Sequence, residues 1–253
     1  MDVLFGKAEE NLAKISEIAK VIKEENTLLV LPELCLTGYS KSEIERSAFG
    51  DGNEEYLKKL SNICAEYSLQ IYGSIAERDE GKFYNTGVFI DSSGLIAKYR
   101  KSHLFGPMGE KDLFSLGQNV VSMTYQEIHF GLSICYDLRF PSMYQTLASK
   151  GAKVLLIVAE WPITRVNHWS ALLRARAIEN QAFVIGVNRV GTDGSYNYGG
   201  HSAVISPYGD PLIEITNSNE GTQFTTLDLG LVEEFRQKFD VREDRSKEVD
   251  LTQ

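Results

Sequence analysis

The order of segments constrains this fold most, because helix-like segments are repeatedly followed by short apolar runs. Between residues 8 and 23, apolar side chains recur at helical spacing, and residues 27–31 form a wholly apolar run. The same order returns in residues 54–67 and 69–75, in 143–150 and 154–158, and in 168–181 and 183–187. Helices that alternate with buried strands are typical of a layered sheet covered by helices. We therefore predict an α/β fold.

Two later segments resemble one another. Residues 88–96 and 203–213 each contain an apolar run, a turn rich in Asp, Ser, Pro or Gly, and a second apolar run. Such a pattern predicts a β-hairpin. The pair indicates a repeat of two half-domains, although hairpins also look alike because few residues suit tight turns.

Length and charge limit the classes of protein and partner. A chain of 253 residues is within the range of an undivided α/β domain, so we expect residues 1–253 to form one domain. The net charge of -9 disfavours nucleic acid and anionic membranes as partners and favours small molecules. Residues 232–253 are strongly charged, which predicts a surface arm at the C-terminus.

Cysteine usage indicates a reducing compartment. Cys35, Cys64 and Cys135 form an odd, sparse set without CxxC spacing, which argues against a disulfide framework and a structural zinc site. The first residues do not have the pattern of a secretion signal, and no stretch approaches the roughly 18 apolar residues of a membrane span. We expect a cytoplasmic protein.

Cys135 is a candidate nucleophile because it stands where an apolar strand gives way to a turn, in Gly-Leu-Ser-Ile-Cys-Tyr-Asp. A thiol needs a nearby base or positive charge to react at neutral pH. Taken alone, a buried and inert cysteine is the commoner case. Ser133 does not fit a serine-hydrolase elbow, because cysteine stands where that motif has glycine.

Glu33 and Lys101 are candidates to assist such a thiol. Glu33 directly follows the apolar run Leu-Leu-Val-Leu-Pro, where burial is expected to raise its pKa and suit it to act as a general base. Lys101 closes another strand, and the period of two places it on the face opposite Arg100, so that it can turn inward and hold an oxyanion. The alternatives are a solvated glutamate at the strand end and an ordinary basic strand end.

Other catalytic arrangements find less support in the sequence. The histidines are His103, His129, His168 and His201, and none stands in a papain-like or caspase-like context. Neither GxGxxG nor GxxxxGK[ST] occurs, which disfavours nucleotide enzymes.

Four motifs follow one another along the chain. They are Leu-Pro-Glu-Leu-Cys-Leu-Thr-Gly-Tyr ending at Tyr39, Tyr-Arg-Lys-Ser-His-Leu-Phe around Lys101, Ile-Cys-Tyr-Asp-Leu-Arg-Phe-Pro around Cys135, and Arg-Ala-Arg-Ala-Ile-Glu-Asn-Gln from Arg174. In this order they resemble the nitrilase superfamily of carbon-nitrogen hydrolases. The resemblance covers nearly the whole chain. It implies a four-layer αββα sandwich and a homodimer or larger assembly.

The resemblance also implies roles for individual residues. Glu33 would be the general base, Cys135 the nucleophile, and Lys101 with the backbone N–H of Tyr136 the oxyanion site. Glu110 matches the second glutamate of the family, which positions the lysine and the nucleophile. No metal or organic cofactor is implied.

The segment Ala-Glu-Trp-Pro-Ile-Thr-Arg-Val-Asn-His-Trp, residues 159–169, looks most like the ω-amidase and 2-oxoglutaramate amidase branch. That branch hydrolyses the terminal carboxamide of a small 2-oxo acid such as 2-oxoglutaramate or 2-oxosuccinamate. Arg139 and Arg165 are candidates to bind the substrate carboxylate, and Trp161 and Tyr39 are further candidates for substrate contact. Both arginines could instead form structural ion pairs, and Trp161 could belong to the core.

Alternatives remain at this point. A nitrilase or an N-carbamoyl amidase would use the same catalytic residues, and a non-catalytic interaction module could retain the fold. Members of the family normally begin with a β-strand ahead of the segment that matches residues 1–5. We expect that first strand to be missing here and its neighbours in the sheet to be left unpaired. Upstream coding sequence is then expected to raise the melting temperature.

Overall fold

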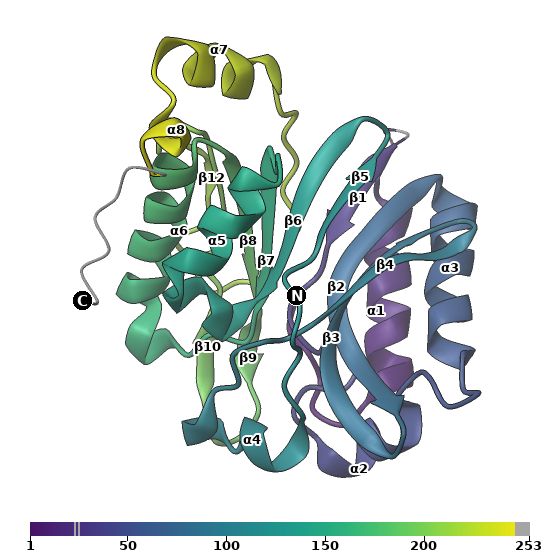
Figure 1. The fold of residues 1–253 in the computed structure, drawn as a ribbon. Helices are drawn as coiled ribbons and strands as arrows, with labels where there is room; N and C mark the ends of the chain where they lie inside the picture. The colour runs from purple at the N-terminus through teal and green to yellow at the C-terminus, as the bar shows by residue number, and fades with distance from the viewer. Residues whose placement is uncertain (23, 25, 246–253) are drawn as a thin grey trace.

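Two β-sheets lie face to face between two pairs of helices in the computed structural model, which describes residues 1–22, 24 and 26–245. Helices α1 (Ala8–Lys20) and α3 (Glu55–Tyr67) cover the outer face of one sheet (Figure 1). Helices α5 (Pro141–Ser149) and α6 (Val166–Asn180) cover the outer face of the other. The predicted α/β class and the expected four-layer αββα sandwich are both confirmed.

The first sheet has the strand order β1-β2-β3-β4 in the described part of the chain. Strand β1 runs parallel to β2, and the other pairs are antiparallel. The bounds are Thr27–Val30 for β1, Leu69–Asp79 for β2, Lys82–Asp91 for β3 and Gly94–Arg100 for β4. Along the outer face, α3 buries Tyr56, Leu57, Leu60, Ile63 and Cys64, a helical spacing that fixes which side meets the sheet.

The second sheet has the order β12-β11-β8-β7-β6-β5, with β6, β7 and β8 parallel at its centre. The bounds are β5 Ser122–Tyr125, β6 Ile128–Ile134, β7 Val154–Ala159, β8 Phe183–Asn188, β11 Ala203–Ile205 and β12 Pro211–Glu214. Every residue of β7 is buried, as expected for a parallel strand covered on both faces.

The remaining elements are short and lie mostly around the ends of the sheets. They are α2 Lys41–Ser47, α4 Glu110–Leu113, β9 Val190–Thr192, β10 Asn197–Gly199, α7 Gly230–Lys238, α8 Val241–Arg245 and the 3-10 turns Gly106–Met108, Cys135–Arg139 and Ile163–Arg165. Among the described residues, no helix is both long enough and apolar enough to cross a membrane.

The predicted helix-to-strand units and both hairpins are confirmed, with shifted ends. Helix α1 ends at Lys20, and residue 23, the last of the predicted helix, lies outside the described residues. Strand β2 continues past the predicted end at residue 75 to Asp79, because it pairs with β3 along its whole second half. The two predicted hairpins are β3–β4 and β11–β12, one in each sheet.

The predicted C-terminal arm is partly docked against the second half of the fold. Val232 of α7 is fully buried. Arg236 donates hydrogen bonds to the carbonyls of Gln181 and Ala152, which lie beyond α6 and α5. Residues 246–253 of the predicted arm lie outside the described residues.

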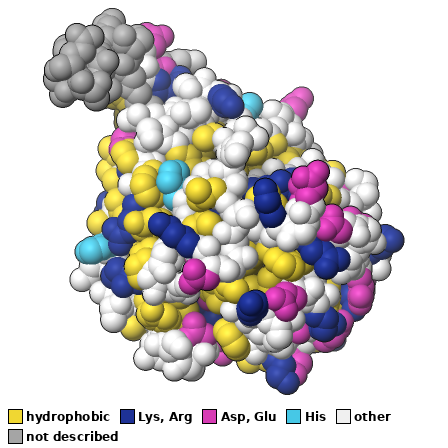
Figure 2. All heavy atoms as spheres, turned by 60° about the horizontal axis from the view of Figure 1, so that its bottom comes forward, with side chains coloured by type: hydrophobic (Ala, Val, Ile, Leu, Met, Phe, Trp, Pro, Cys, Tyr) yellow, Lys and Arg dark blue, Asp and Glu magenta, His cyan; other side chains and the backbone are white. Residues whose placement is uncertain are grey.

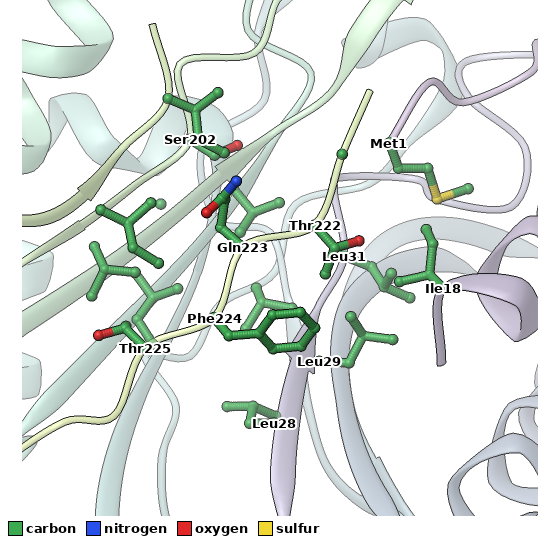
Figure 3. Close-up of a pocket in the computed structure, with 18 of the residues that line it drawn as sticks. Met1, Ile18, Leu28, Leu29, Leu31, Ser202, Thr222, Gln223, Phe224 and Thr225 are labelled. Carbon is green, nitrogen blue, oxygen red and sulfur yellow. The ribbon is translucent and has the colours of Figure 1, made fainter. Parts of the chain in front are cut away.

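Strand β1 stands at the edge of the first sheet, beside an apolar groove. The groove is lined by β1, by parts of β8 and β11, and by residues 221–225, which carry no regular secondary structure (Figure 3). Phe224 lies across the groove near Leu28 and Leu29. Residues 1–5 contribute a single parallel bridge, between Asp2 and Val190.

Candidate active site

Four side chains predicted to carry chemistry meet where strands of both sheets end. Glu33 follows β1, Lys101 follows β4 and Cys135 follows β6. Glu110 is the first residue of α4. All four are buried, so the two facing sheets bring residues from distant parts of the chain into one enclosed cluster.

Lys101 lies between the two carboxylates. Its Nζ donates to Glu33 Oε1 at 2.7 Å and to Glu110 Oε1 and Oε2 at 2.7 and 2.8 Å. Glu110 Oε2 also accepts the backbone N–H of Phe105 at 2.7 Å. Glu33 Oε2 accepts the backbone N–H of Glu160 at 2.8 Å. The ammonium and both carboxylates are therefore fixed in position.

The expectation that the pKa of Glu33 lies above its ordinary value is wrong. Burial does act in that direction, but the ion pair with Lys101 and the hydrogen bonds from Lys101, Glu160 and Cys135 outweigh it and lower the pKa of Glu33 below its ordinary value. Burial by itself would lower the pKa of Lys101, but the carboxylates of Glu110 and Glu33 raise it. For Glu110, burial outweighs the attraction of Lys101, and its pKa is raised.

Cys135 begins the 3-10 turn that follows β6 and has a φ of +46°, a conformation that non-glycine residues rarely adopt. Burial raises the pKa of its thiol well above the ordinary value, and the Glu33 carboxylate raises it further against the opposing effect of Lys101. The thiol is therefore protonated at neutral pH. Its interaction with the neighbouring Glu33 offers the proton a direct route to a carboxylate.

Asp137 holds this turn in place. Its Oδ2 accepts the backbone N–H of Ile134 at 2.9 Å and the hydroxyl of Tyr99 at 2.7 Å. Its Oδ1 accepts the backbone N–H of His103 at 3.1 Å. From α6, Arg176 donates to the carbonyl of Leu138 at 2.7 Å. The strained residue is thus flanked by buried polar contacts from three other segments.

A pocket opens beside Cys135. Its lining comprises Tyr39, Phe105, Met108, Cys135, Tyr136, Arg139, Glu160, Trp161, Pro162 and Arg165. This set contains all four side chains predicted for substrate contact, together with Tyr136 of the predicted oxyanion site. Figure 2 shows the face on which α2 and α4 lie in Figure 1, where lysine and arginine side chains stand among hydrophobic ones.

Both predicted arginines stack on aromatic rings of the pocket. The guanidinium of Arg139 lies 4.8 Å from the ring centre of Trp161, and that of Arg165 lies 5.0 Å from that of Phe105. Within residues 1–22, 24 and 26–245, no carboxylate forms an ion pair with Arg139 or Arg165. Their positive charges therefore stay available at the pocket, unlike those of structural ion-pair arginines.

Trp161 and Tyr39 have more than one contact. Trp161 is 3% exposed and packs on Trp169, so it belongs to the core as well as to the pocket wall. The hydroxyl of Tyr39 donates to Glu33 Oε1 at 2.9 Å. In this structure Tyr39 holds the carboxylate of Glu33, a contact that was not predicted for it.

Three further residues at the site were not predicted from the sequence. Asn85, in β3, donates from Nδ2 to Glu33 and Glu110. The carboxyl group of Glu160 and the guanidinium of Arg189 are both buried and lie 3.1 Å apart. Burial raises the pKa of Glu160 to about 8, against the attraction of Arg189. Two of them had a signal in the sequence: Asn85 is a polar residue within the buried part of β3, and Glu160 is a glutamate directly after the wholly apolar β7.

No group of three or more His, Cys, Asp or Glu side chains in the described part of the chain is arranged to hold a metal ion. The site is instead built from one thiol, one ammonium and carboxylates, which suits nucleophilic and acid–base chemistry.

Comparison with known proteins places this site in a family. The model of the family described as carbon-nitrogen hydrolase matches residues 5–237. A 2-oxoglutaramate amidase of Bacillus subtilis is 37% identical over 251 residues, covering 98% of this chain and 96% of that protein. The omega-amidase YafV of Escherichia coli K12 is 33% identical, covering 86% of this chain and 83% of that protein.

A solved structure of a CN-hydrolase superfamily protein from Xanthomonas campestris is 30% identical, with a TM-score of 0.89, and the match covers 96% of this chain and 93% of that one. The sequence similarity and the shared fold extend over nearly the whole chain. This protein belongs to the carbon-nitrogen hydrolase family and is an amidase that acts on carbon–nitrogen bonds.

Proposed function

We propose that this protein hydrolyses the terminal carboxamide of a small 2-oxo acid, 2-oxoglutaramate or 2-oxosuccinamate, to the dicarboxylate and ammonia. Relatives from Bacillus subtilis and Paenarthrobacter nicotinovorans are named 2-oxoglutaramate amidase. The observation that carries the proposal is the position of the Cys135 thiol beside Glu33, itself held by Lys101, next to a pocket with two arginines that have no acidic partner among the described residues.

In the first half of the reaction, Glu33 takes the thiol proton while Cys135 Sγ attacks the amide carbon. The thiol has a high pKa and Glu33 a low one, so the proton moves as the sulfur–carbon bond forms rather than beforehand. Lys101 and the backbone N–H of Tyr136 receive the oxyanion. Glu33 then returns the proton to the nitrogen, the carbon–nitrogen bond breaks, and ammonia leaves a thioester on Cys135.

In the second half, Glu33 takes a proton from water, and the hydroxide oxygen attacks the thioester carbon. The carbon–sulfur bond breaks, the proton returns to the sulfur, and the free acid leaves. No step requires a metal or an organic cofactor. Glu110 holds Lys101 throughout, since it contacts the ammonium through both carboxylate oxygens.

Arg139 and Arg165 are proposed to bind the carboxylate of the 2-oxo acid. A guanidinium presents parallel donors that match a carboxylate, and stacking on a ring fixes its plane. The stacking of Arg139 on Trp161 and of Arg165 on Phe105 supports this role. An Arg139→Lys or Arg165→Lys variant with unchanged substrate affinity would remove that arginine from the proposal.

We also propose that the protein works in the cytoplasm as a homodimer or larger assembly. Its cysteines are free and buried, which suits a reducing compartment. Exposed apolar side chains near α6, such as Ile178 and Tyr208, support an interface there. Light scattering of the purified protein would measure the assembly size.

The test is ammonia release from 2-oxoglutaramate, beside glutamine, a simple aliphatic nitrile and a carbamoyl amino acid. We expect turnover of 2-oxoglutaramate and its complete loss in Cys135→Ala, with activity retained in Cys64→Ala, a buried cysteine outside the site. Appreciable turnover by the Cys135→Ala protein would contradict the nucleophile. If the wild type turned over only the nitrile or only the carbamoyl compound, the proposed substrate class would be wrong and the protein would be assigned to the class of that compound.

A further inference from the structure

Asn85 contacts the buried cluster of Glu33, Lys101 and Glu110, and the mechanism proposed above gives it no role. It lies in the centre of β3, and its side chain is fully buried. Its Nδ2 lies 2.8 Å from Glu33 Oε1 and 3.0 Å from Glu110 Oε1. Its backbone carbonyl accepts the N–H of Lys101 at 2.9 Å. One residue thus contacts three members of the cluster.

The orientation of the amide follows from its neighbours. Ionised carboxylate oxygens only accept hydrogen bonds, so the NH2 group must face them and the carbonyl oxygen must point away. Asn85 Oδ1 accordingly finds no donor within the described residues, an arrangement that is costly for a buried oxygen. The side chain of Asn85 therefore contributes the two N–H donors of its amide.

The oxygens that Asn85 contacts are also those that Lys101 contacts. Lys101 Nζ lies 2.7 Å from Glu33 Oε1 and 2.7 Å from Glu110 Oε1, and its third contact is Glu110 Oε2 at 2.8 Å. A lysine ammonium has three N–H donors, and Lys101 has three contacts with carboxylate oxygens in this structure. Lys101 can donate to an oxyanion only when one of these contacts weakens.

We propose that Asn85 is a positioning residue that keeps the Glu33 and Glu110 carboxylates in place while Lys101 redirects a donor to the oxyanion. This inference rests on the roles proposed above for Glu33 and Lys101. Asn85 acts through these groups and needs no contact with the substrate.

The chemistry of an amide suits this task. Two carboxylates face one ammonium, so a second cation would neutralise the cluster and weaken Glu33 as a base. An apolar side chain would leave the carboxylate oxygens short of donors when Lys101 moves. A neutral pair of N–H donors holds both oxygens without adding charge.

The test compares Asn85→Leu and Asn85→Asp with the wild type. Leucine has a similar size and no donor, whereas aspartate keeps the shape and replaces the donors by a third carboxylate. For both we expect kcat to fall about a hundredfold, the scale for losing one preorganised donor, with little change in KM. The acid limb of kcat/KM should move to higher pH, because a carboxylate that loses a donor has a higher pKa.

Gln181→Met is the matched control. Gln181 is a fully buried amide at the end of α6, outside the set of residues that line the pocket, and it hydrogen-bonds the backbone of Phe239 and Val241. Its loss should lower the melting temperature and leave kcat and the pH profile unchanged. If both Asn85 variants fold and retain the wild-type kcat and the wild-type acid limb, the proposal is overturned. It is also overturned if their loss of kcat only parallels their loss of melting temperature.

A second readout separates this inference from the proposed substrate. Alkylation of Cys135 by iodoacetamide, followed across pH by mass spectrometry, reports the proton transfer to Glu33 without any amide turnover. A shift of this profile to higher pH in Asn85→Leu would support the role of Asn85 even if 2-oxoglutaramate were not hydrolysed. An unchanged profile would refute it even if that amide were turned over.

Discussion

At the scale of single residues, Cys135 has a strained backbone conformation and is also the residue whose thiol must be held in a fixed position for the proposed reaction. A positive φ at a non-glycine residue costs on the order of 1–3 kcal/mol and persists only where surrounding contacts enforce it. Asp137 supplies such contacts, since its carboxylate accepts hydrogen bonds from Ile134, Tyr99 and His103. The turn is thus held by groups that take no part in the proposed chemistry.

Tyr39→Phe provides a prediction at this scale. The variant removes the hydrogen bond from the hydroxyl to Glu33 Oε1 and keeps the ring in the pocket wall. A hydrogen bond to an ionised carboxylate lowers its pKa, so its loss should raise the pKa of Glu33. Activity that requires ionised Glu33 should then disappear at a higher pH. The acid limb of kcat/KM measures this, and an identical limb in both proteins would contradict the contact.

The positions of candidate site residues could be predicted where a strand pattern points to a single position. Glu33 and Cys135 each follow an apolar run, and the period of two separates Lys101 from Arg100, whose side chain pairs with Glu77. The sign of the pKa shift of Glu33 was wrong because it depends on Lys101, which is remote in sequence. The same reason explains why Asn85, Glu160 and Arg189 were not predicted. The role of each depends on partners that come into contact with it only in the folded protein.

At the scale of elements, α6 lies closely against the second sheet. Gly186 in β8 faces this helix, and a Cβ atom there would lie 2.5 Å from Leu173 Cδ1 and 3.0 Å from Trp169. Both of these side chains are fully buried. Glycine at this position therefore sets the distance between α6 and β8.

Gly186→Ala is expected to destabilise the fold by about 1–3 kcal/mol through overpacking. In a chain of this length that corresponds to roughly 2–4 °C of melting temperature per kcal/mol. Gly221→Ala is the control, because a Cβ atom there would meet nothing within 4 Å. Thermal unfolding of both variants is the measurement, and equal melting temperatures would show that α6 can move away at little cost.

Element prediction was reliable for order and type, and weaker for length. The helical spacing of apolar residues in α3 and the apolar run of β7 identify these elements without tertiary information. The extension of β2 to Asp79 had no such pattern, because its second half is specified by pairing with β3 rather than by apolar periodicity. The short α4, which carries Glu110, is likewise determined by its surroundings.

At the scale of the whole molecule, the buried pair of Glu160 and Arg189 couples global stability to pH. The pKa of Glu160 is about 8 in the folded protein, above the ordinary value of 4.5. A raised pKa in the folded state contributes stability that is fully present below pH 4.5 and is lost as pH rises to about 8. The loss is on the order of a few kcal/mol, since each unit of pKa shift corresponds to about 1.4 kcal/mol.

Glu160→Gln removes this titration, so its melting temperature should fall less than that of the wild type between pH 5 and pH 8. Glu127→Gln, which removes an exposed carboxylate, should behave like the wild type. Calorimetry at several pH values provides the comparison. Parallel curves for wild type and Glu160→Gln would mean that Glu160 is ionised in the folded protein across this range.

The position of β1 at the edge of its sheet has a consequence for the protein in concentrated solution. Along the side that faces the groove, β1 pairs with no other strand among the described residues, and the groove beside it is lined mainly by apolar side chains (Figure 3). An unpaired strand edge of this kind is a template for main-chain pairing with another chain. Self-association by this route would increase with protein concentration. Added salt would not weaken it, because it does not depend on charge. Substitution of a single β1 residue by lysine would prevent it.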